Sequence, residues 1–141
     1  MSTKAVDVKK ALRGYLAGMD LVTADNVQVT YGFPSRSPER KWAVVGEVSW
    51  EGSDWATNRA RTEAFSVMVA FSVQVPGGTS EQTEAYAVAL AAEFEDLLEI
   101  DPSIDGLCVT SSFTPRSLKS WPIDGAYECQ YETVVRVTAR P

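Results

Sequence analysis

Histidine is absent from the sequence, and cysteine occurs only twice. Without histidine the chain lacks the commonest general base, the commonest zinc ligand and the base of Ser–His and Cys–His nucleophiles. Cys108 and Cys129 have no CxxC spacing and lie in apolar, strand-like runs, so two buried thiols are favoured over a disulfide or a metal site. No cofactor-binding motif appears either, and we expect no enzymatic activity, no cofactor and no metal.

A long hydrophobic run is also missing. The longest strongly apolar segment, FSVMVAFSVQV at residues 65–75, is too short for a transmembrane helix and alternates like a strand. The first ten residues, MSTKAVDVKK, have no apolar core of the kind that a signal peptide needs. We therefore expect a protein that is made in the cytoplasm and has no membrane partner.

Basic residues are outnumbered by acidic ones, 13 to 19, which gives a net charge of −6. Sequence-specific nucleic-acid binding needs a basic face, and this charge argues against it. One segment, EGSDWATNRART at residues 51–62, holds Trp55, Arg59 and Arg61, which could bind a single strand by stacking and charge. Because Arg and Trp are also favoured at protein contacts, we prefer a solvated loop or a protein contact.

Apolar residues recur every three or four positions in two segments, which predicts two amphipathic helices. The first helix covers residues 5–19. The second follows PGGTSEQ, where Thr79 and Gln82 fit a capping box, and it ends at Asp101 because Pro102 disfavours helical geometry in the residue before it. Alternating apolar residues predict strands over residues 27–31, 42–50, 65–75, 107–113 and 127–139.

These elements predict a single α+β domain over residues 1–141 with the order α-β-β-β-α-β-β. We expect a mostly antiparallel sheet with two helices packed on it. Residues 114–125 are expected to form a loop. Trp42, Val44, Gly46, Val48 and Trp50 are predicted to share one face of their strand. The second face of the strand at 65–75 is small and only weakly polar, which predicts that this strand is central and covered on both sides.

The segment EFEDLLEIDPSIDG, residues 93–106, holds six acidic side chains. Asp101 and Asp105 lie where the helix ends, and aspartate is favoured in turns by its hydrogen bonds to the nearby backbone. The spacing lacks the alternating oxygen ligands of an EF-hand calcium loop. The four other acids stand in the last two turns of the helix, where the dipole disfavours each by roughly 0.3–1 kcal/mol. We expect a cationic group to offset that cost.

These four acids, Glu93, Glu95, Asp96 and Glu99, are therefore predicted to form part of a subunit interface. The candidate basic partners on a neighbouring subunit are Arg59 and Arg61, or Lys9, Lys10 and Arg13 on the first helix. The simpler alternative is that the acids are solvated or pair with the first helix inside one chain.

Taken together, the chain resembles the tail terminator, or tail completion, proteins of long-tailed, siphovirus-type bacteriophages. The resemblance covers nearly the whole length. It rests on VKKALRGYL, VTYGFP, WAVVGEVSW, FSVMVAFSVQV, AYAVALAAEFEDLLEIDPSIDGL and ECQYETVVRVTARP.

The resemblance implies a small protomer that forms a ring, commonly a hexamer, on the head-proximal end of the tail tube. Such a ring ends tube polymerisation and provides a docking surface for the head. The implied partners are other copies of the chain, the tail tube protein and a head–tail connector or neck protein, and genome DNA passes through the ring. No catalytic residue comes with the resemblance. The alternatives are another neck, connector or minor tail protein and, more distantly, a carboxylate-dependent hydrolase.

Overall fold

The computed structural model describes residues 3–33, 40–55 and 61–140, with the backbone alone at 51–55 and at Arg61. Three helices and five strands follow one another along this part of the chain. They are α1 (Ala5–Ala17), α2 (Asp20–Asp25), β1 (Gln28–Tyr31), β2 (Lys41–Trp55), β3 (Arg61–Val75), α3 (Ser80–Ile100), β4 (Thr110–Ile123) and β5 (Ala126–Ala139). The predicted α+β class and element order are confirmed, with the short helix α2 as an addition.

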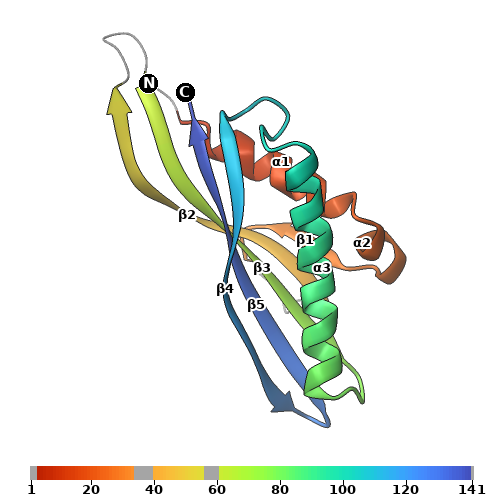
Figure 1. Cartoon of the computed structure of the whole chain (residues 1–141). Helices are drawn as coiled ribbons and strands as arrows, with labels where there is room; N and C mark the ends of the chain where they lie inside the picture. Colours follow the sequence, from red (N-terminus) through yellow and green to blue (C-terminus); the bar gives the residue numbers. More distant parts are fainter. Residues whose placement is uncertain (1–2, 34–39, 56–60, 141) are drawn as a thin grey trace.

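The five strands form one sheet in the order β1-β2-β3-β5-β4 (Figure 1). β1 runs parallel to β2, and the other neighbouring strands are antiparallel. β3 is therefore the central strand, as predicted, and β1 and β4 are the two edges. The mostly antiparallel sheet is confirmed.

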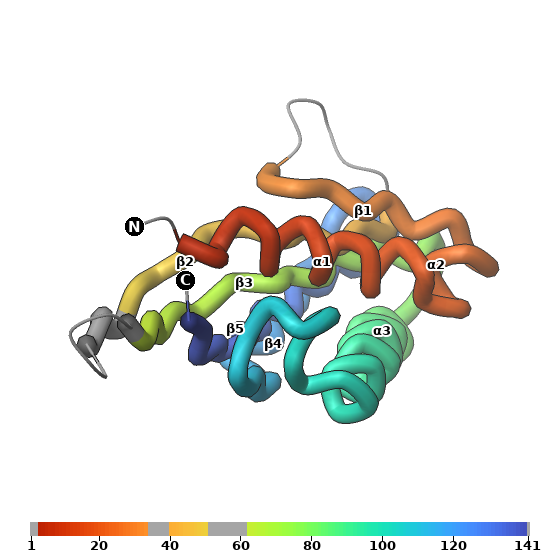
Figure 2. The backbone as a smooth tube through the Cα atoms, turned by 90° about the horizontal axis from the view of Figure 1, so that it is seen from above, coloured from red at the N-terminus to blue at the C-terminus, as the bar shows by residue number. Residues whose placement is uncertain are grey.

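Both long helices pack on the same face of the sheet. α1 lies over β1 and β2, and α3 lies over β3, β5 and β4. Figure 2 shows α1 along its length and α3 nearly end-on, so the two helices cross at a steep angle. Their apolar stripes and one face of the strands form a single core. Its largest fully buried apolar side chains are Leu12, Leu16, Met19, Phe65, Phe71, Leu90, Phe94 and Ile104. Burial of these side chains is the main stabilising term of the fold.

The prediction that β3 is covered on both faces is met by the burial of side chains rather than by a second layer of helices in the described part of the chain. No described helix packs on the second face, which we call the open face of the sheet. Ala70 and Ser72 on that face are nevertheless buried, whereas Met68 is half-buried. The side chains of Ala70 and Ser72 are small, and the neighbouring strands shield them. The Ser72 hydroxyl donates a hydrogen bond to the Glu128 carboxylate at 3.3 Å. Small residues on a central strand therefore do not require a second covering layer.

The two predicted faces of β2 exchange halfway along the strand. The pairing with β3 shifts register between Val45 and Val48, which marks a β-bulge. Beyond the bulge Val48 packs against the core, and the Trp50 ring lies 6.3 Å from that of Phe65, centroid to centroid. Glu47 turns to the open face instead. The prediction that Val48 and Trp50 share a face with Trp42 is therefore wrong, because one extra residue inverts the alternation.

Residues 114–125, predicted to be a loop, belong mostly to β4 and to the hairpin turn after it. Asp124 and Gly125 form this turn with left-handed backbone angles, φ 37° and 80°, as two-residue hairpins require. Pro115 and Pro122 lie within β4, and the pairing with β5 shifts register just after Pro115. Proline is tolerated there because β4 is an edge strand, whose outer N–H groups need no partner in the sheet.

A buried carboxylate joins α1 to the sheet. Glu63 of β3 is 1% exposed and accepts hydrogen bonds from the Thr3 hydroxyl, from the Lys4 N–H at 3.3 Å and from the Trp50 indole N–H at 2.7 Å. The charge lies beside the first turn of α1, where the helix dipole favours an anion. Sequence reasoning did not identify this residue.

Candidate functional site

Of the four acids predicted to form an interface, Glu93 is bound within its own chain. Its carboxylate accepts hydrogen bonds from the N–H groups of Asp20 at 2.5 Å and Leu21 at 3.3 Å. These are the first two residues of α2, so Glu93 satisfies N–H groups that the helix itself cannot pair. The positive group that offsets Glu93 is therefore the N-terminal end of α2 rather than a side chain of a neighbour.

Asp101 ends α3 as predicted. Its carboxylate accepts hydrogen bonds from the Ser103 hydroxyl at 2.6 Å, the Asp105 N–H at 3.0 Å and the Tyr15 hydroxyl at 3.1 Å. These bonds, the one from Ser103 first, lower the pKa of Asp101. Asp105 has a left-handed backbone, φ 57°, and an exposed side chain. The interpretation of both residues as parts of a turn is confirmed.

Glu95 and Glu99 line a groove between α3 and β4. The groove consists of two adjoining hollows of about 310 and 150 Å³. We call it the α3–β4 groove. Its lining residues include Val88, Ala92, Glu95, Glu99, Phe113 and Tyr131. A third hollow of about 290 Å³ adjoins it along β4 and is lined by Arg116, Leu118 and Tyr131 among others. Asp96 is exposed and does not line the groove. The structure thus separates the four acids, with two of them at one surface.

The floor of the groove is apolar and fixed to the core. The Phe113 ring lies edge-on to Phe94, and Phe94 lies edge-on to Phe71, with centroids 6.2 Å apart in each pair. Partial burial, and then the nearby Glu95 charge, raise the pKa of Tyr131. An acidic rim therefore stands directly over an apolar floor that is already formed in the single chain.

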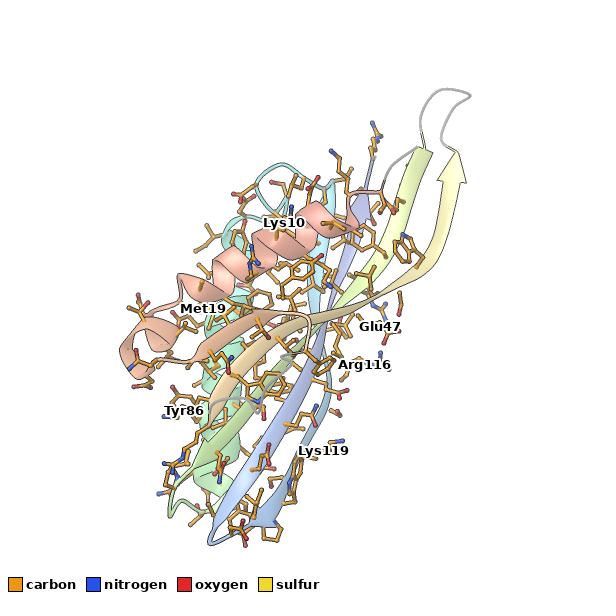
Figure 3. The ribbon with its side chains drawn as sticks, turned by 180° about the vertical axis from the view of Figure 1, so that it is seen from behind. Lys10, Met19, Glu47, Tyr86, Arg116 and Lys119 are labelled. Carbon is orange, nitrogen blue, oxygen red and sulfur yellow. The ribbon has the colours of Figure 1, made fainter. Side chains whose placement is uncertain are left out.

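The predicted basic residues of α1 divide into two groups. The Lys9 ammonium lies 4.2 Å from the centroid of the Tyr31 ring, and the Arg13 guanidinium lies 5.7 Å from it. Lys9 is half-buried, and this burial lowers its pKa. Lys10 and Arg13 are exposed, and Figure 3 labels Lys10 on α1. The cations that α1 offers to a partner are thus Lys10 and Arg13.

The other two predicted basic partners are not placed. Arg59 lies outside the described residues, and only the backbone of Arg61, the first residue of β3, is described. Their part in an interface remains a prediction.

The structure does not bring the acids of the groove next to the basic residues of α1. Glu95 and Glu99 face β4 at one edge of the sheet, whereas α1 lies over β1 and β2 at the other edge. The two surfaces are therefore separate within one protomer, although both helices pack on the same face of the sheet.

The open face carries a larger hollow of about 570 Å³ that sequence reasoning missed. Side chains of both signs line it, among them Glu47, Glu132, Arg116 and Arg136. Figure 3 shows Glu47 and Arg116 on this part of the sheet. The bulges in β2 and β4 help to bring these residues together. The alternation of apolar and polar residues does not predict where such bulges occur. The balance of charges suits polar protein contacts better than binding of an anion.

The two thiols lie in the interior, as predicted. Cys108 and Cys129 are free and buried, and burial raises the pKa of both to about 11. Since the thiolate is the reactive form, neither is an activated nucleophile at neutral pH. The described residues contain no group of three potential His, Cys, Asp or Glu ligands that could hold a metal. Among them, too, no helix has the length and apolar character to cross a bilayer.

Comparison with known proteins shows a relationship of fold. No protein-family model and no curated protein matches the sequence. A solved structure does match. The chain is similar to a chain of the virion of a native gene transfer agent particle, with a TM-score of 0.55 and 14% sequence identity. The match covers 93% of this chain and 94% of the other, so the two share a fold over nearly their whole length.

Proposed function

We propose that the protein is a structural component of a phage-like virion, and within it the tail terminator that forms a ring on the head-proximal end of the tail tube. The observation that carries the proposal is the fold shared with a chain of a virion particle over 93% of this sequence. The resemblance of the sequence to tail terminator proteins, which rests on six separate segments, supports the finer assignment.

The surface of the protomer agrees with assembly into a ring. A ring needs a head-to-tail contact, in which one surface of a protomer meets a different surface of its neighbour. The chain offers an acidic groove at the β4 edge and a basic helix face at the β1 edge. The rims are polar, so we expect monomers at low concentration and closed rings on the tube end. By resemblance to the tail terminators, these rings are expected to be hexamers.

Another neck, connector or minor tail protein is the second candidate, because the matched particle contains many components and the match alone does not select one. A carboxylate-dependent hydrolase fits less well. Glu95 and Glu99 stand on the same helix and on the same rim of the groove. They therefore cannot flank a bond from two sides, as paired catalytic carboxylates do.

Antibody labelling of purified virions tests this assignment. A tag on the protein, or an antibody against it, is expected to label the junction between tail tube and head in electron micrographs. Label along the tube, at the distal tip or on the head would contradict the terminator role and favour another virion component. Absence of the protein from purified virions would contradict both.

A further inference from the structure

The α3–β4 groove is built to receive another surface. Its floor is apolar and held in place by the contact of Phe113 with Phe94. Val88 on the groove and Leu118 in its adjoining hollow are each 43% exposed. Exposed apolar side chains gathered at a groove, rather than scattered singly, mark a place where a partner binds.

The rim of the groove limits the chemistry of that partner. Glu95 and Glu99 are four residues apart on α3, so their side chains begin about 6 Å from each other on one side of the helix. A partner that fits needs two cations at a similar spacing, next to small or apolar side chains that can enter the groove.

One surface of the same chain has this composition. Val6, Lys10, Arg13 and Ala17 recur at intervals of four, three and four residues, which places them on one face of α1, and all four are exposed. We call them the outer face of α1. Lys10 and Arg13 are one helical turn apart, as Glu95 and Glu99 are. Val6, which is 50% exposed, and Ala17 supply the small apolar contacts.

The geometry points to a head-to-tail contact in which the outer face of α1 of one copy docks into the α3–β4 groove of the next. Lys10 and Arg13 then meet Glu95 and Glu99. The two surfaces are different and belong to helices that lie over different strands, so the contact can repeat from copy to copy. A repeated head-to-tail contact closes into a ring where its rotation returns to the first copy. The inference rests on the proposed ring and names the surfaces that build it.

Charge favours a second copy as the occupant. The chain has a net charge of −6, so copies repel each other unless surfaces of opposite sign meet. The groove and the outer face of α1 provide such a pair. Lys9 and Glu93 are not part of it, because Lys9 is half-buried over Tyr31 and Glu93 binds the first residues of α2. Arg13 lies farther from the Tyr31 ring, at 5.7 Å, and is exposed.

Two charge-reversed variants test the contact when they are mixed. Glu95→Lys with Glu99→Lys makes the groove basic, and Lys10→Glu with Arg13→Glu makes the outer face of α1 acidic. In each variant alone both surfaces carry the same sign, so we expect ring formation to fall at least about tenfold. In an equal mixture every groove finds an outer face of opposite sign, and rings of alternating variants are expected to form again.

The readout is the number of rings in negative-stain micrographs, at the highest soluble concentration and on purified tail tubes. Glu81→Lys with Asp96→Lys is the matched control for the groove variant, because it raises the net charge by the same amount at exposed residues outside both surfaces. Thermal melting followed by circular dichroism shows whether each variant folds. Recovery in the mixture cannot arise from a merely structural role of these residues.

The outcomes separate the contact from the ring itself. Rings that survive both reversals, or that the control abolishes to the same degree, would overturn the contact and leave the ring in place. Defects that the mixture does not repair would also overturn it. If the unchanged protein forms no ring under either condition, both the contact and the terminator function fail. If the groove reversal removes rings only on tubes, the groove binds the tube protein and the proposed occupant is wrong.

Discussion

At the scale of single residues, the buried carboxylate of Glu63 links parts of the chain that are far apart in sequence. It accepts a hydrogen bond from Trp50 on β2 and from Thr3 and Lys4 at the start of α1. A carboxylate in the interior is tolerated only when its oxygens have partners, and here the donors come from two elements. The residue thereby fixes where α1 begins relative to the sheet.

Replacing Glu63 with glutamine is expected to lower the free energy of unfolding by about 2 kcal/mol, since a charge-assisted acceptor is lost and an amide N–H faces other donors. Urea unfolding followed by tryptophan fluorescence measures the change. The exposed Glu99→Gln is the matched control and should change stability by no more than about 0.5 kcal/mol. A Glu63→Gln protein as stable as this control would show that the buried hydrogen bonds contribute nothing net.

Local patterns predicted residues whose partners are close in sequence. Asp101 forms its turn with Ser103 and Asp105, and Thr79 caps α3 with Gln82. Glu63 and Glu93 could not be predicted in this way, because Thr3 and Lys4 lie 60 and 59 residues from Glu63, and Asp20 and Leu21 lie 73 and 72 residues from Glu93. Only the fold brings these partners together. For the same reason, the four acids of α3 appeared as one group in the sequence but separate in space.

At the scale of elements, α3 and β3 were predictable and β4 was not. The capping box and Asp101-Pro102 define both ends of α3, and a regular alternation defines β3. β4 contains two prolines and several serines, which are typical of loops. They are compatible with a strand only because β4 lies at the edge, a property of the whole sheet that its own sequence does not contain.

The capping box gives a prediction for α3. The Thr79 hydroxyl accepts the Gln82 N–H at 3.2 Å, and the Gln82 side chain accepts the Thr79 N–H at 3.0 Å. Thr79→Ala should lower the free energy of unfolding by about 1 kcal/mol, because the Gln82 N–H loses its acceptor. Thr79→Ser keeps a hydroxyl and is expected to keep most of the stability in the same urea titration. Equal losses in the two variants would mean that the hydroxyl does not cap the helix.

At the scale of the whole molecule, the arrangement of layers determines which surfaces the proposed ring can use. Both long helices lie on one face of the sheet, which leaves the other face open and places unlike surfaces at the two edges. The composition predicts a protein that binds other proteins rather than an enzyme. The position of the proposed contact surfaces depends on strand order, which the pattern of the sequence did not predict.

The central claim is that copies of this protein close into a ring on the end of a tail tube. Negative-stain electron microscopy of purified tail tubes mixed with the purified protein tests it most directly. We expect closed rings of one subunit number, six by resemblance to the tail terminators, on one end of each tube, and tubes that no longer lengthen when more tube protein is added. Tubes with bare ends that continue to grow, together with a protein that stays monomeric or forms only two-fold dimers, would contradict the account.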